Sequence, residues 1–102
     1  MQRPSAADVA RALAAQYERP FGGKPGGRYR ISRKTLRATA VRRRLPDDFL
    51  RQLAEEMFEL GYVFLDLETF FAVASARSFA NYRRLSEAAM GTDHAPGEHA
   101  PH

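Results

Sequence analysis

The stretch that decides the fold spans residues 31–67 and reads ISRKTLRATAVRRRLPDDFLRQLAEEMFELGYVFLDL. Its middle predicts a helix from Asp47 to Leu60. Asp47 and Asp48 suit the positive end of a helix, and Gly61 is a typical residue just after its end. The apolar residues recur at helical spacing and form one stripe: Phe49, Leu50, Leu53, Met57 and Leu60.

A shorter helix precedes this one. Ser32 is a good N-cap, and the pattern after it predicts a helix over residues 33–41. Residues 42–46 then form a turn, because proline suits the entry to the following helix. We expect one face of the short helix to point inward (Leu36, Ala40 and Val41) and the other to point outward (Arg33, Lys34 and Arg37).

The residues after Gly61 predict a β-hairpin. Residues 62–67 and 70–75 are β-branched and aromatic runs of strand length, separated by Glu68-Thr69. This pair is not a strong turn signal, so the sequence leaves open which side chains face inward, and whether the aromatic ones form core or an interface. We expect the inward side chains of the first strand to be Val63, Leu65 and Leu67.

The flanks complete one domain over residues 1–90. Ser5 predicts the start of a first helix that ends near Glu18, and the glycines of residues 20–27 indicate a flexible loop before a short strand over 28–31. A last helix is predicted over 79–90, capped by Ser78, with a disordered tail at 91–102. We expect the last helix to point three side chains inward: Phe79, Tyr82 and Leu85.

The order of these elements is helix, short strand, short helix, turn, longer helix and hairpin. In this order and in its hydrophobic pattern the chain resembles a winged helix-turn-helix domain over residues 5–75. The resemblance implies an α+β fold with a three-helix core, a short strand and a C-terminal hairpin, here followed by a further helix. It also implies DNA binding, with the helix at 47–60 entering the major groove.

Composition excludes several classes of function. The 102 residues contain no cysteine, so a thiol nucleophile, a disulfide scaffold and a Cys-ligated metal site are ruled out. His94, His99 and His102 all lie in the predicted tail, where no catalytic set can converge on them. We therefore expect no enzyme, no metal, no cofactor and no small-molecule substrate. The chain lacks an apolar run of membrane-spanning length, and we expect a cytoplasmic protein.

Charge is unevenly distributed along the chain, although Lys and Arg exceed Asp and Glu by only 16 to 12. Between residues 19 and 45 all ten charges are positive, whereas residues 47–68 carry seven acids and only Arg51 as a base. An unopposed basic run favours a polyanionic partner. We expect backbone contacts to double-stranded DNA from Arg28, Arg30, Arg33, Lys34, Arg37, Arg42, Arg43 and Arg44.

The helix at 47–60 departs from the resemblance, because its exposed acids would be repelled by phosphates. Only Arg51 and Gln52 have side chains suited to reading base edges, and the hairpin tip carries no cation. The chain would then be a DNA-binding regulator or accessory factor. The alternative is a protein-interaction module, an adaptor or inhibitor, that binds a basic partner or a second copy through Asp48, Glu55, Glu56 and Glu59. The sequence leaves DNA, RNA and protein open as partners.

Overall fold

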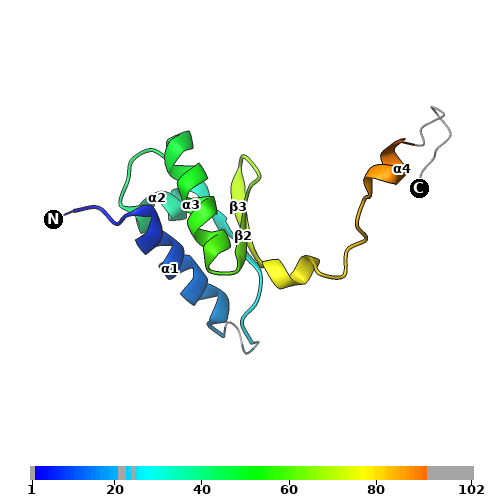
Figure 1. Cartoon of the computed structure of the whole chain (residues 1–102). Helices are drawn as coiled ribbons and strands as arrows, with labels where there is room; N and C mark the ends of the chain where they lie inside the picture. The colour runs from blue at the N-terminus through cyan, green and yellow to red at the C-terminus, as the bar shows by residue number, and fades with distance from the viewer. Residues whose placement is uncertain (1, 21–22, 24, 92–102) are drawn as a thin grey trace.

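The computed structural model describes residues 2–20, 23 and 25–91. Helices lie on one side of a three-stranded antiparallel sheet whose strand order is β1-β3-β2, so the predicted α+β class is confirmed (Figure 1). The elements within the described residues are α1 (Ala6–Glu18), β1 (Tyr29–Ser32), α2 (Arg33–Ala40), α3 (Asp47–Glu59), β2 (Tyr62–Asp66), β3 (Phe70–Ser75), the 3-10 helix η1 (Ala76–Phe79) and α4 (Glu87–Gly91).

The first two helices begin at the predicted caps. The Ser5 hydroxyl accepts a hydrogen bond from the Asp8 amide at 3.1 Å, and the Asp8 carboxylate accepts one from the Ser5 amide, which completes a capping box. The Ser32 hydroxyl likewise accepts from the Thr35 amide at 3.0 Å. Helix α2 ends where Val41 adopts left-handed backbone angles (φ 54°). The predicted inward position of Val41 is wrong, because this turn leaves its side chain 59% exposed.

Helix α3 has the predicted start and ends one residue early. Its stripe is buried as expected except at Leu60, which is 45% exposed. Leu60 is already the C-cap, and Gly61 follows with a φ of 94°. That backbone conformation is costly for residues with a side chain, so glycine is favoured there.

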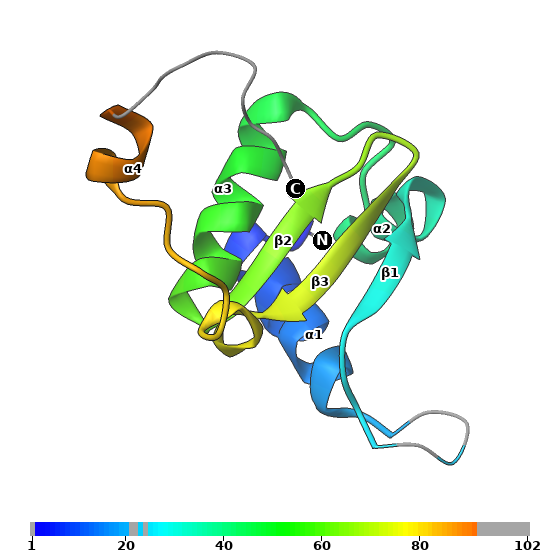
Figure 2. The same ribbon diagram turned by 90° about the vertical axis from the view of Figure 1, so that its right-hand side faces the viewer.

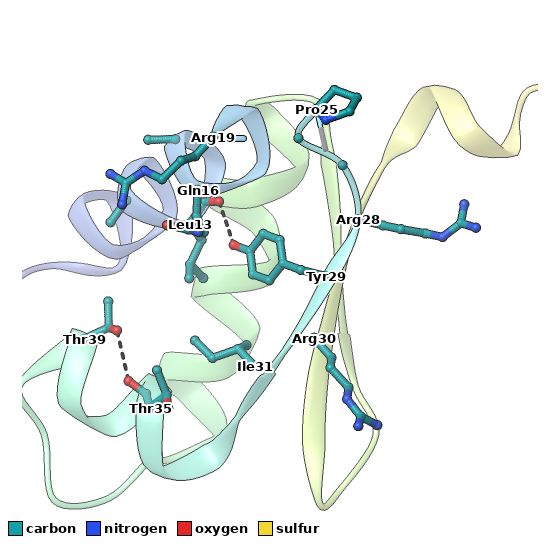
Figure 3. Close-up of a pocket in the computed structure, with 14 residues that line it drawn as sticks. Leu13, Gln16, Arg19, Pro25, Arg28, Tyr29, Arg30, Ile31, Thr35 and Thr39 are labelled. Carbon is teal, nitrogen blue, oxygen red and sulfur yellow. Dashed lines mark hydrogen bonds between the residues drawn. The ribbon is translucent and has the colours of Figure 1, made fainter. Parts of the chain in front are cut away.

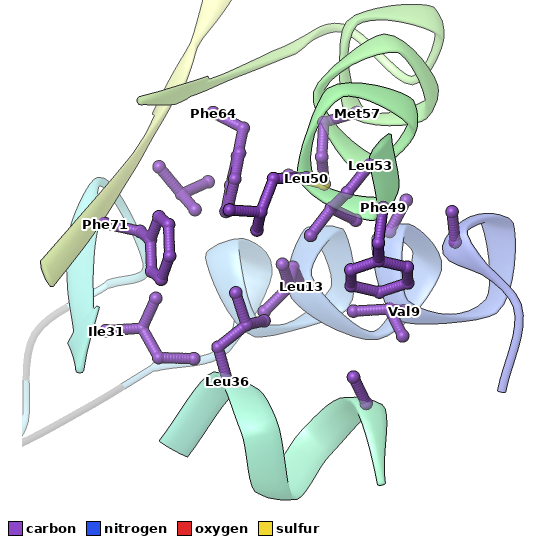
Figure 4. Packing of buried hydrophobic residues seen from close by; sticks show 14 residues of the cluster. Val9, Leu13, Ile31, Leu36, Phe49, Leu50, Leu53, Met57, Phe64 and Phe71 are labelled. Atoms are coloured by element: carbon purple, nitrogen blue, oxygen red, sulfur yellow. The ribbon is translucent and has the colours of Figure 1, made fainter. Parts of the chain in front are cut away.

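The core lies between the helices and one face of the sheet (Figure 4). Helices α1 and α3 pack against each other across the inner face, and α2 closes one end. Within the described part of the chain, no helix lies over the other face of the sheet (Figure 2). The largest fully buried side chains are Phe71, Leu36, Leu53, Met57, Val9 and Val73.

The two strands of the hairpin pair across Glu68-Thr69 as predicted, but the predicted inward side chains are wrong. Phe64 is buried and Tyr62 packs against the core, whereas Leu65 and Leu67 are exposed and Val63 is only half-buried. Phe64 lies opposite the fully buried Val73, and cross-strand partners point to the same face of a sheet.

The predicted helix over 79–90 is also wrong. The chain forms η1, capped by Ser75 rather than Ser78, and then no helix or strand until α4. Phe79, Tyr82 and Leu85 are exposed instead of inward. An amphipathic segment of this length is unstable as a helix unless another surface covers its apolar side. The predicted tail beyond residue 91, and residues 21, 22 and 24 of the predicted loop, lie outside the described residues.

No helix in the described part of the chain is long and apolar enough to cross a membrane.

Candidate nucleic-acid interface

The predicted phosphate contacts lie on consecutive parts of the fold. Arg28 and Arg30 belong to the segment of β1, and α2 and the loop that follows it provide the others. Side chains of β1 alternate between faces: Tyr29 and Ile31 point toward the helices, whereas Arg28 and Arg30 point away from them (Figure 3). Arg28 immediately precedes β1, at the end of the strand that is distant from α2.

Arg33 is engaged in holding the hairpin to α2. Its Nη1 donates to the carbonyl oxygen of Glu68 at 2.9 Å and lies 3.3 Å from the carboxylate of Asp66. Its guanidinium carbon lies 4.7 Å from the centre of the Phe71 ring, which is fully buried. Arg33 therefore covers the edge of the core as well as carrying charge.

The hairpin tip consequently has a cation beside it, although none of its own residues supplies one. The Asp66 carboxylate also accepts a hydrogen bond from the Glu68 amide, where the backbone turns through a φ of 74°. Sequence reasoning missed this arrangement, because 33 residues separate Arg33 from Asp66 and no local pattern connects them.

Arg42 and Arg30 also lie over phenylalanine rings. The guanidinium carbon of Arg42 is 4.1 Å from the centre of the Phe49 ring, and its Nη2 lies 3.5 Å from the Pro4 carbonyl oxygen. The Arg42 Nε is buried and has no hydrogen-bond partner among the described residues. Arg30 stacks on Phe70 at 5.2 Å while remaining exposed on the outer face of the sheet.

Four cations on α2 and its following loop make no such contact. Within the described residues, their side chains have no hydrogen bond, ion pair or ring contact. Arg37 is half-buried and the other three are exposed. We call this set the basic surface: Lys34, Arg37, Arg43 and Arg44.

Helix α3 presents the opposite charge. It carries five acids and one base, a net charge of −4. Arg51 forms an ion pair with Asp48 on the same helix, which leaves Gln52 as the unpaired base-reading candidate. Three of the predicted partner-binding acids, Asp48, Glu55 and Glu59, are exposed, and Glu56 is half-buried. Phe58 lies among them with 67% of its surface exposed.

The groups with shifted pKa values belong to the framework rather than to either charged surface. Burial raises the pKa of Tyr29 to about 12, and its hydroxyl donates to the Leu13 carbonyl oxygen at 2.7 Å. The hydrogen bond that Tyr62 donates to the Glu18 carboxylate at 2.8 Å raises the pKa of Tyr62. The described residues contain no cluster of His, Asp and Glu able to hold a metal ion.

Comparisons with protein-family models, with curated proteins and with solved structures gave no match to this chain.

Proposed function

We propose that this chain is a winged-helix-like domain that binds double-stranded DNA by contacting its phosphates with the basic surface. The element order, with an outer β1, a helix pair and a β2–β3 hairpin, supports the winged-helix assignment. One observation carries the functional proposal: four cations with no partner among the described residues lie within residues 34–44.

The number of cations without a side-chain partner predicts how many phosphates the chain contacts, and so how strongly salt weakens binding. If only the basic surface binds, four cations give a slope of log affinity against log salt of about −3.6. Raising the salt from 50 to 200 mM would then weaken binding about 150-fold. If all eight cations predicted to contact phosphates took part, the slope would be about −7. The slope therefore reports whether the other four, Arg28, Arg30, Arg33 and Arg42, also contact DNA.

The test is fluorescence anisotropy with a labelled duplex of arbitrary sequence across that range of salt. Replacing Arg43 and Arg44 by alanine should reduce the magnitude of the slope by about 2. The matched control replaces Arg83 and Arg84, an adjacent exposed pair beyond η1 with the same charge. Absence of binding at 50 mM salt would refute the proposal. An equal loss in both double variants would show that net charge alone, and not the basic surface, drives binding.

Arg51 and Gln52 are the side chains proposed to read bases. Arg51 would have to break its ion pair with Asp48 to form two hydrogen bonds with guanine. The free energy of that ion pair is therefore subtracted from the contribution of Arg51 to binding. Arg51→Ala should relax the preference for one base pair and leave affinity for other duplexes unchanged. A loss of equal size on every sequence would show that Arg51 contacts phosphate instead.

The second candidate function is binding of a basic protein by the exposed face of α3. The observation in its favour is Phe58, a large exposed aromatic side chain between acids on a helix, because such anchors are frequent at interfaces. Replacing Glu55 and Glu59 by lysine separates the two functions. The change should preserve or improve affinity for DNA if the basic surface binds phosphates, whereas it should abolish binding to a basic partner.

A further inference from the structure

A groove of about 740 Å³ lies between the C-terminal half of α1, residues 25–28, β1 and α2 (Figure 3). Leu13 and Ile31 form its apolar floor together with small side chains of α1. The hydroxyl of Tyr29 reaches across to the Leu13 carbonyl oxygen and fixes the strand to the helix. The groove is open on one side, so an elongated ligand could lie along it.

One wall of the groove is the backbone edge of β1. β1 is an outer strand, because β3 pairs with only one of its sides. Four successive residues, 28–31, line the groove, although their side chains alternate between the two faces of the sheet. Residues of both faces of β1 therefore border the groove. Within the described residues, no backbone hydrogen bond of a turn or loop involves β1.

The opposite wall is held at a fixed distance by a close backbone contact. Gly26 lies against the end of α1, where a Cβ atom at this position would be 2.2 Å from the Tyr17 carbonyl oxygen. The loop can therefore pack there only because residue 26 lacks a side chain.

An unpaired strand edge invites a further strand, and the surroundings specify its sequence. Side chains of an added strand would alternate, as those of β1 do. Those on the groove side would meet Leu13, Tyr29 and Ile31, which favours apolar residues. Those on the other side would lie next to Arg28 and Arg30, which favours acids. No acidic residue lines the groove.

We propose that the groove binds an extended peptide segment of a partner protein, with alternating apolar and acidic residues, which pairs with β1 as a fourth strand. This site is separate from the basic surface and does not depend on DNA binding. Arg28 stands at the start of β1 and has no side-chain contact among the described residues, so its charge is available to such a peptide.

The probe is a fluorescein-labelled heptapeptide, Val-Glu-Val-Glu-Val-Glu-Val, titrated into the isotope-labelled full chain. We expect saturable binding below 1 mM, with the largest NMR shifts at the backbone amides of residues 28–31. A probe with N-methyl groups on all its peptide bonds has no N–H donor on either edge, and it should lose at least tenfold in affinity. A Val-Lys heptapeptide should bind more weakly than the acidic probe.

Two matched variants locate the charge effect. Arg28→Glu should lower the affinity for the acidic probe about two- to tenfold. Arg44→Glu makes the same charge change in the basic surface and should leave that affinity unchanged.

The proposal is overturned if no probe binds at 1 mM, or if the N-methylated probe binds equally well. It is also overturned if the shifts map to residues 34–44, since the probe would then be an anion on the basic surface. DNA binding is measured separately, so either proposal can fail alone.

Discussion

Replacing Arg33 by methionine tests whether this residue belongs to the framework or to the basic surface. Methionine keeps an unbranched, apolar side chain over Phe71 but removes the guanidinium. The loss includes the hydrogen bond to the Glu68 carbonyl oxygen at 2.9 Å, the ion pair with Asp66 at 3.3 Å and the stacking at 4.7 Å.

The magnitude follows from how exposed these contacts are. About a third of the Arg33 side chain is exposed, so the ion pair contributes at most about 1 kcal/mol. The hydrogen bond from a charged group contributes about 1.5 kcal/mol at the lower end of its range, and the stacking on a ring adds about 0.5–1 kcal/mol. These contributions are not independent, and we expect Arg33→Met to lower the free energy of unfolding by about 2 kcal/mol.

The assay is urea unfolding followed by circular dichroism, with Lys34→Met as the control. Lys34 is the next residue, is exposed and has the same charge, so its replacement should change the free energy of unfolding by less than about 0.5 kcal/mol. If Arg33→Met is no more destabilising than Lys34→Met, the contacts to the hairpin are not maintained in solution. Arg33 would then count as a fifth cation of the basic surface.

Two further predictions concern the walls of the groove. A spectrophotometric titration of the tyrosines should show one ionisation near pH 12, absent in Tyr29→Phe. Folding raises the pKa of Tyr29 from about 10, so the stability that the neutral hydroxyl contributes is complete below pH 10 and is lost as the pH rises through 12. If all four tyrosines titrated near their ordinary pKa, the burial of Tyr29 would be contradicted. Gly26→Ala should lower the free energy of unfolding by about 1–3 kcal/mol, because the new Cβ would overlap the end of α1. Gly27→Ala, which meets nothing within 4 Å, should be nearly neutral in the same urea unfolding assay, and equal effects would refute the close contact.

Local signals predict helices α1, α2 and α3 well because the start of each has its own chemistry. Ser5 and Ser32 cap the helices that follow them, and Asp47 begins α3. These contacts join residues within one turn, so a short window of sequence contains both partners. The same reasoning predicted the stripe on α3 except at Leu60, where the helix had already ended.

Which face of the hairpin is buried could not be predicted in this way. In YVFLDL, residues 62–67, apolar side chains occupy both alternating sets, so either face could be buried. The choice depends on Phe71 and Val73 of β3, which are fully buried and bring Phe64 with them. A similar limit applies to residues 79–90, whose helical pattern has no surface to pack against in the described structure.

For the candidate site, the sequence predicts which segments carry the cations. It does not predict which cations contact other side chains of the fold. Arg33 meets Phe71 and Arg30 meets Phe70, each about 40 residues away along the chain, so neither contact has a local signature. The Arg51–Asp48 pair has the i, i+3 spacing of neighbours on a helix, and sequence reasoning could have found it. The groove beside β1 depends on how the loop at Gly26 packs, which composition does not specify.

The stacked arginines change what a basic composition means for this chain. A small domain has little interior, and much of its apolar surface lies at the rim of the core. Arg33 and Arg42 cover two such rims, over Phe71 and Phe49, with planar groups that a lysine could not place in the same way. Part of the positive charge is therefore a consequence of packing, and net charge alone is a weak reason to expect DNA. The stronger reason is position: four cations without a packing role lie within residues 34–44, on α2 and its following loop.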